Sequence, residues 1–164
     1  MSTATQSPTT PITSRLSKAH VELVPGSLQA MFDLHGAVAR VGVRKVVLDL
    51  VALRASQING CSFCVHMHAA DLRKAGESDE RVDTVAAWRE SPWFTDEERA
   101  ALALAEAVTR VADHPDPVSD ELWDEVADHF SEPEVAALVV AIAATNVWNR
   151  LNAATRQPAG SLPL

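Results

Sequence analysis

The sequence predicts an all-α fold with about seven helices in one domain. Apolar residues recur at three- and four-residue intervals through most of the 164 positions, and no segment alternates apolar and polar residues over more than a few positions. Helix-start signals are frequent, since Thr95 and Ser131 each precede a glutamate by three residues, the capping-box pattern. Glycine and proline separate the periodic segments, as expected for turns between helices.

Three helices are predicted in the first half of the chain, over residues 28–41, 43–58 and 61–76. Ser27 is of a residue type that caps helix N-termini, and Gly42 separates the first helix from the second. The turn sequence Asn59-Gly60 ends the second helix. The third ends at Gly76, because glycine tolerates the left-handed conformation that commonly follows a helix.

Four further helices are predicted in the second half, over residues 78–90, 95–111, 119–130 and 131–154. Pro92 lies just after the fourth, and the stretch Asp113–Pro117 forms a rigid connection between the fifth and the sixth. The last helix contains AALVVAIAAT and is apolar nearly all round. We therefore expect it to be buried on every side, in part against another subunit.

Charge and hydropathy exclude two classes of partner. The net charge is −8 and the pI is about 5.1, whereas nucleic acid and anionic membranes both require a basic patch. The longest apolar run, 135–144, is shorter than the roughly 20 residues that span a bilayer. We expect a cytoplasmic protein with a flexible tail at 1–18, a helical domain at 19–158 and a short tail at 159–164.

The chemistry-bearing residues gather at the start of the third predicted helix. Cys61, Cys64 and His68 follow one another at helical spacing, so they lie on one face. A helix N-terminus favours thiolate over thiol, and His68 can take the thiol proton. Thiols three residues apart in a first turn can also close a disulfide. His66 lies off this face and is expected on the surface.

Zinc is the alternative at this site. Two cysteines and a histidine are suitable zinc ligands, and they leave one coordination position open. The remaining histidines supply no second pair with ligand spacing. We expect a redox dithiol without metal or cofactor, because a cytoplasmic chain rarely uses two cysteines as a structural staple.

The run Asp49-x-x-x-x-Arg54-Ala-Ser-Gln-Ile-Asn-Gly-Cys61-x-x-Cys64-x-x-x-His68 resembles the alkylhydroperoxidase (AhpD-like) branch of the carboxymuconolactone decarboxylase superfamily. The segments 87–95 and 97–102 resemble the same family, and the resemblance covers roughly residues 15–158. It implies an all-helical, homo-oligomeric peroxidase that reduces hydrogen peroxide or organic hydroperoxides.

The same resemblance implies a role for each site residue. Cys64 attacks the peroxide oxygen, Cys61 captures the resulting sulfenic acid as a disulfide, and His68 with Asp49 relays protons. A dithiol protein of lipoyl or thioredoxin type then reopens the disulfide. The chain departs from the family in having Asp49 where glutamate is usual and Phe63 where some members have histidine.

Other interpretations stay open at this point. Asp49 lies in an apolar helix and needs a partner, so it can instead form a structural ion pair with Arg54 or a neighbouring subunit. A decarboxylase of γ-carboxymuconolactone-type substrates belongs to the same superfamily but does not depend on a C-x-x-C pair. A third alternative is a non-catalytic redox sensor whose disulfide alters assembly or a protein contact.

Overall fold

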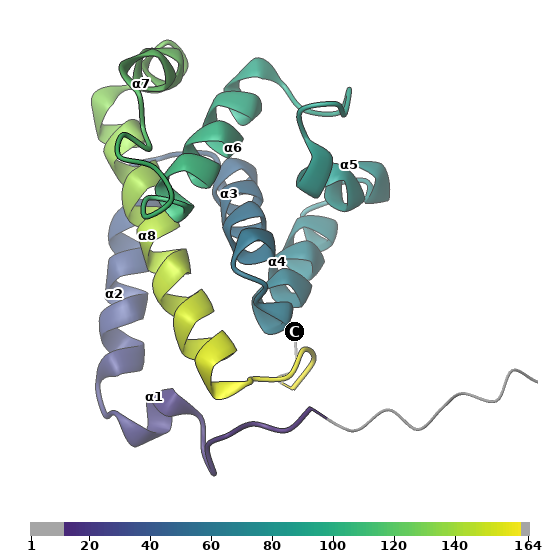
Figure 1. Ribbon diagram of the computed structural model, residues 1–164, viewed down its shortest axis with the longest axis vertical. Coiled ribbons are helices and arrows are strands. Elements are labelled where there is room, and N and C mark those ends of the chain that lie inside the picture. Colours follow the sequence, from purple (N-terminus) through teal and green to yellow (C-terminus); the bar gives the residue numbers. More distant parts are fainter. Residues whose placement is uncertain (1–11, 162–164) are drawn as a thin grey trace, which may run out of the picture.

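The computed structural model describes residues 12–161, and within them it confirms the all-α prediction (Figure 1). The elements are α1 (His20–Leu23), α2 (Ser27–Ala39), α3 (Lys45–Ile58), α4 (Ser62–Lys74), α5 (Asp79–Thr84), the 3-10 turn η1 (Val85–Ala87), α6 (Asp96–Thr109), α7 (Asp120–Ala127) and α8 (Glu132–Thr155). Both predicted capping boxes are present, at Thr95 before α6 and at Ser131 before α8.

Besides shifts of a few residues at helix ends, the structure differs from the sequence prediction at three places. α1 was not expected, because a single helical turn is too short to show periodicity. The N-cap of α2 is Gly26, whose φ is 86°, so Ser27 is the first helical residue rather than the cap. The helix expected over 78–90 ends at Thr84 and continues as η1; the Thr84 hydroxyl bonds back to the Glu80 carbonyl oxygen at 2.6 Å.

The core holds α3 between its neighbours. One cluster joins α3, α6 and α8, and its fully buried members include Val47, Val51, Leu104, Leu138 and Ile142. A second cluster packs the other side of α3 against α4, η1 and α6, with Leu50, Leu53, Leu72, Val85 and Leu102 at its centre. Each such side chain contributes roughly 1.5–3 kcal/mol when buried. The end of α3, and with it the start of α4, is therefore held from both sides.

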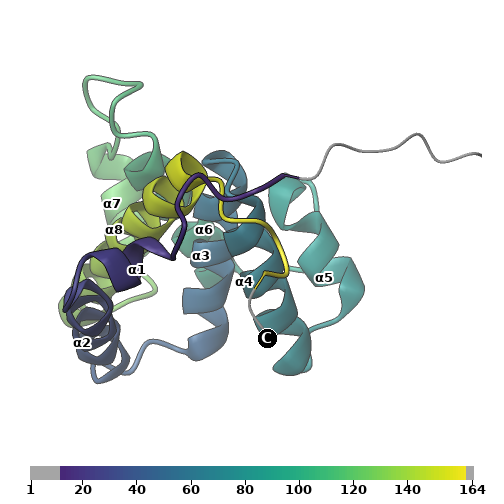
Figure 2. The same cartoon turned by 90° about the horizontal axis from the view of Figure 1, so that it is seen from below.

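The single subunit leaves part of α8 exposed, so the expected burial of that part against another subunit stays a prediction. α8 contacts α2, α3, α4 and α6, yet Val140 and Val147 are 37% and 44% exposed. The reason is that α2 covers only part of the helix, as Figure 2 shows from one end. α2 also carries exposed apolar side chains, among them Phe32, which is 57% exposed.

The described end of the N-terminal segment lies against the C-terminal end of α8. The Arg15 backbone N–H donates to the Thr155 carbonyl oxygen at 2.8 Å, and the Arg15 guanidinium donates to that of Ala154 at 3.0 Å. The predicted tail at 1–18 lies outside the described residues for positions 1–11, as does the end of the second tail at 162–164.

The hydropathy of the described helices bears on whether one could span a membrane. Between residues 12 and 161, no single helix is long and apolar enough to cross a bilayer. The pair α7 and α8 meets the length and composition criteria only when taken together, and the two are bent by 118° at their junction.

Candidate active site

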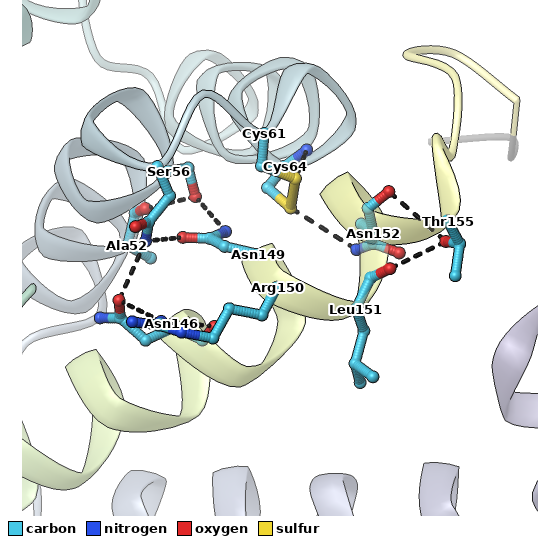
Figure 3. Close-up of a disulfide and its surroundings, with 11 residues drawn as sticks. Ala52, Ser56, Cys61, Cys64, Asn146, Asn149, Arg150, Leu151, Asn152 and Thr155 are labelled. Carbon is cyan, nitrogen blue, oxygen red and sulfur yellow. Dashed lines mark hydrogen bonds between the residues drawn. A yellow bond between two sulfur atoms is a disulfide. The ribbon is translucent and has the colours of Figure 1, made fainter.

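The turn that carries the cysteines is pinned to α8 by side-chain amides. The Asn59 amide donates to the side-chain oxygens of Asn146 and Asn149, each at 2.9 Å. Asn149, which is fully buried, donates in turn to the Ser56 hydroxyl at 3.0 Å (Figure 3). Gly60 takes the left-handed conformation, with φ 65°, that lets the chain reverse into α4. Side chains of α8, 87 and 90 residues later in the chain than Asn59, thus fix where α4 begins.

Cys61 and Cys64 form a disulfide at this helix start (Figure 3). Their Cα atoms are 5.3 Å apart, within the usual range for a disulfide. Cys61 is the N-cap of α4, and its Sγ accepts the Cys64 backbone N–H at 3.3 Å. The two residues are only 2% and 1% exposed. The predicted placement of the pair in one helical turn is confirmed.

A third residue reaches the sulfur atoms from α8. The Asn152 side-chain amide donates to Cys64 Sγ at 3.5 Å, and Asn152 is itself 6% exposed. Sequence reasoning missed it. The available signal was the recurrence of asparagine at 146, 149 and 152, a three-residue interval that places polar amides on one face of an otherwise apolar helix.

Cys64 opens onto an apolar cavity of about 560 Å³. The cavity lies between α1 and α2 on one side and α4 and α8 on the other, and its lining includes Leu28, Phe32, Phe63, Met67, Thr145 and Trp148. Cavities of roughly 300–1,000 Å³ with a few polar groups are typical of small-molecule sites. The polar groups here include His68, His20, His35 and Asn152.

His68 lies in the wall of the same cavity as Cys64, in line with their predicted common face. Burial lowers the pKa of His68 to about 4, against a smaller opposing effect of Asp71. The imidazole is therefore neutral near pH 7 and available as a proton acceptor. No group among the described residues bonds to its buried Nδ1. His66 is exposed, as expected.

Asp49 does not join this group by any hydrogen bond to His68 or to either cysteine. Its carboxylate, 13% exposed, pairs with Lys45 Nζ at 2.5 Å, one turn earlier on α3. Burial raises the pKa of Asp49, and Lys45 partly offsets this. The alternative prediction of an ion pair between Asp49 and Arg54 is wrong, because the Arg54 guanidinium binds Glu106 at 2.6 Å. The proton-relay role of Asp49 stays a prediction.

The zinc alternative has no support from the arrangement of side chains. Over residues 12–161, no three histidine, cysteine, aspartate or glutamate side chains are grouped closely enough to hold a metal ion. The two sulfur atoms are bonded to each other.

Known proteins share both the sequence pattern and this fold. Residues 25–107, half of the chain, match the model of the carboxymuconolactone decarboxylase family. YdfG of Bacillus subtilis (strain 168), an uncharacterised protein, is 34% identical over 87% of this chain and 96% of its own length. An alkyl hydroperoxide reductase AhpD of Hyphomonas neptunium is 46% identical, but over only 25% of this chain and 23% of its own.

Solved structures extend the likeness to the whole subunit. The crystal structure of ATU0492 from Agrobacterium tumefaciens, a protein of unknown function proposed as an AhpD of antioxidant defence, superposes with a TM-score of 0.83. It is 34% identical, covering 93% of this chain and 99% of that one. The debrominase Bmp8 shares the fold, with a TM-score of 0.70 at 23% identity over 81% of this chain and 70% of its own. The chain belongs to the carboxymuconolactone decarboxylase family, in its AhpD-like branch.

Proposed function

We propose that this protein is a thiol-dependent peroxidase that reduces hydrogen peroxide or organic hydroperoxides through a cycle of the Cys61–Cys64 dithiol and disulfide. The observation that carries the proposal is the position of Cys64. It lines an apolar cavity together with a neutral histidine, while its disulfide partner lies one helical turn away. This arrangement combines a nucleophile, a base and a resolving thiol.

The cycle begins with reduced protein. The Cys64 thiolate attacks the terminal oxygen of the hydroperoxide, the O–O bond breaks, and the leaving alkoxide takes a proton to become an alcohol. Protonated His68, having accepted the thiol proton, is the donor within the same cavity. Cys61 then attacks the Cys64 sulfenic acid, water leaves, and the disulfide forms. A dithiol protein of lipoyl or thioredoxin type restores both thiols.

The proposal is tested by anaerobic stopped-flow with reduced protein and cumene hydroperoxide. The wild type is expected to consume one equivalent of peroxide, and Cys64→Ser none. The matched variant Cys61→Ser should still consume one equivalent, because it lacks only the resolving thiol. Its sulfenic acid should be trapped by dimedone. Full consumption by Cys64→Ser would disprove the proposal.

The competing decarboxylase function is separated by a variant that lacks both thiols. Cys61→Ser/Cys64→Ser should be inactive with every hydroperoxide. If this double variant turned over a γ-carboxymuconolactone substrate as fast as the wild type, the decarboxylase function would replace the peroxidase function that we propose. A redox sensor would instead show a change of assembly between oxidised and reduced samples in light scattering, without turnover in the presence of a dithiol.

We further propose that the chain works as a homo-oligomer in the cytoplasm. Apolar side chains on α2 and α8, such as Phe32 and Val147, are exposed in the single subunit. A reducing compartment would keep the dithiol recharged. Light scattering coupled to size-exclusion chromatography should give a mass above 17.6 kDa, and a monomer at micromolar concentration would contradict this.

A further inference from the structure

The cavity beside Cys64 has a wall without counter-charges. Among the described residues that line it there is no lysine, arginine, aspartate or glutamate. Two of its polar side chains already have partners, since the Thr145 hydroxyl donates to the Ala141 carbonyl oxygen at 2.9 Å and the Gln157 amide donates to the Ser161 hydroxyl at 2.6 Å. A charged group that entered the cavity would therefore find no side chain of opposite charge in its wall.

The histidines of the wall do not supply a positive charge in its interior. Burial lowers the pKa of His20, and it lowers the pKa of His68 to about 4, so both rings are neutral near pH 7. His35 is exposed, and its Nδ1–H donates to the Met31 carbonyl oxygen at 2.7 Å, one turn earlier on α2. A charge on that ring would be solvated by water. The interior of the cavity is thus uncharged as well as apolar.

Aromatic rings from three helices contribute to the same wall. They are Phe32 of α2, Phe63 of α4 and Trp148 of α8. The His20 ring lies against Trp148, with the ring centroids 5.9 Å apart and the planes inclined by 57°. Aromatic rings attract one another in such tilted arrangements at centroid distances of about 4.5–7 Å. The wall therefore offers a guest ring the contacts that its own rings already make with each other.

We propose that this cavity binds uncharged aromatic hydroperoxides in preference to hydroperoxides that carry a carboxylate, such as those of fatty acids. A carboxylate would leave water for an apolar wall without a counter-charge, which is unfavourable. An uncharged ring instead removes apolar surface from water when it enters, which is favourable. The inference rests on the proposed function for the reaction, but selection by charge is a property of binding and can be measured without turnover.

Two fluorescent dyes with the same skeleton measure this selection. N-phenyl-1-naphthylamine is uncharged, and 1-anilinonaphthalene-8-sulfonate differs from it by one sulfonate. Near pH 8, above the ordinary histidine pKa of about 6.5, titration of the oxidised wild type should give a Kd about tenfold lower for the uncharged dye, or about 1.4 kcal/mol. The preference should persist in 1 M sodium chloride, where the Debye length is about 3 Å. Equal affinities would overturn the proposal, and so would a preference that vanished in salt, because it would come from the net charge of −8.

A matched pair of lysine variants locates the selection in the cavity. Leu28 and Leu34 both lie on α2 and are each 38% exposed, but only Leu28 lines the cavity. Leu28→Lys and Leu34→Lys change the net charge of the chain equally. We expect Leu28→Lys to bind the sulfonate dye about tenfold more tightly than Leu34→Lys and the uncharged dye more weakly, because its ammonium group supplies the missing counter-charge. Equal affinities in the two variants would refute the cavity as the binding site.

The substrates themselves are compared in stopped-flow with the reduced wild type. Cumene hydroperoxide should be consumed about tenfold faster than its para-carboxylate, and Leu28→Lys should reduce this difference whereas Leu34→Lys should not. A carboxylate consumed as fast as the uncharged peroxide would show that the cavity does not select by charge. If neither peroxide were consumed, the proposed peroxidase function would fail, and the dye titrations would still decide whether the cavity selects uncharged molecules. The two proposals therefore fail separately.

Discussion

Replacing Glu106 with glutamine should destabilise the fold more than any surface charge change. Glu106 lies on α6 with a side chain only 8% exposed, and it accepts hydrogen bonds from three donors. These are Arg54 Nε at 2.7 Å, Trp88 Nε1 at 3.1 Å and an Arg89 nitrogen at 2.5 Å. Arg54 is itself 12% exposed, so removal of the carboxylate leaves its charge buried without a counter-charge.

The magnitude follows from that burial. Breaking a buried ion pair by removing one partner costs about 3–5 kcal/mol, and a glutamine that keeps one acceptor oxygen places the cost near the lower end, about 3 kcal/mol. For a chain of this length, each kcal/mol lowers Tm by roughly 2–4 °C, so the expected fall is about 6–12 °C. This is a large part of a typical stability of about 5–15 kcal/mol.

Urea unfolding followed by circular dichroism measures the effect against a matched control. Glu97→Gln, on the same helix, removes a carboxylate that pairs with Arg44 at 2.7 Å on the surface. Such exposed pairs contribute about 0–1 kcal/mol. If Glu106→Gln and Glu97→Gln lost similar amounts of unfolding free energy, the reasoning that burial determines the loss of stability would be refuted.

The stability that the Glu106 carboxylate contributes depends on pH, and the direction follows from the shift of its pKa. Burial tends to raise the pKa of Glu106, but the bonds from Arg89, Trp88 and Arg54 outweigh it and lower the pKa below its usual value. The unfolded carboxyl therefore binds a proton at higher pH than the folded one does. The stabilisation is present above the unfolded pKa and is lost as pH falls through the folded pKa. The difference in the free energy of unfolding between wild type and Glu106→Gln should therefore become smaller as the pH falls.

Three further predictions concern the site. In a Cys61→Ser background, Asn152→Leu should raise the thiol pKa of Cys64 by about one unit, because a hydrogen bond to a charged group contributes about 1.5–3 kcal/mol. Thiolate absorbance at 240 nm measures this pKa, and an unchanged pKa would contradict the prediction. The folded pKa of His68, about 4, lies below the unfolded value of 6.5, so the unfolded state binds the proton first. Wild-type stability should therefore fall between pH 6.5 and 4, and His68→Leu should flatten this slope in urea titrations. Asp49→Asn should slow peroxide consumption by about tenfold if Asp49 relays protons, whereas an unchanged stopped-flow rate would assign it to the ion pair with Lys45 alone.

Features that depend on a few neighbouring residues could be predicted from the sequence. The capping boxes at Thr95 and Ser131 mark true helix starts, because a cap bonds to a backbone group three residues away. The position of Cys61 and Cys64 in one turn also follows from their spacing, which suits a disulfide. For these features the relevant atoms belong to the same short segment.

Features made by segments far apart in the chain were decided by the tertiary structure. Asn152 lies 88 residues from Cys64, yet its amide reaches the sulfur only because α8 packs beside the start of α4. Arg54 could pair with several carboxylates by sequence, and the packing of α3 on α6 selects Glu106. The apolar cavity beside Cys64 likewise forms where α1 and α2 approach α4 and α8. The sequence by itself thus determined the longer helices and the placement of the two cysteines in one turn. Three-dimensional packing decided what surrounds each sulfur, because such contacts depend on how helices meet and leave no local periodicity in the chain.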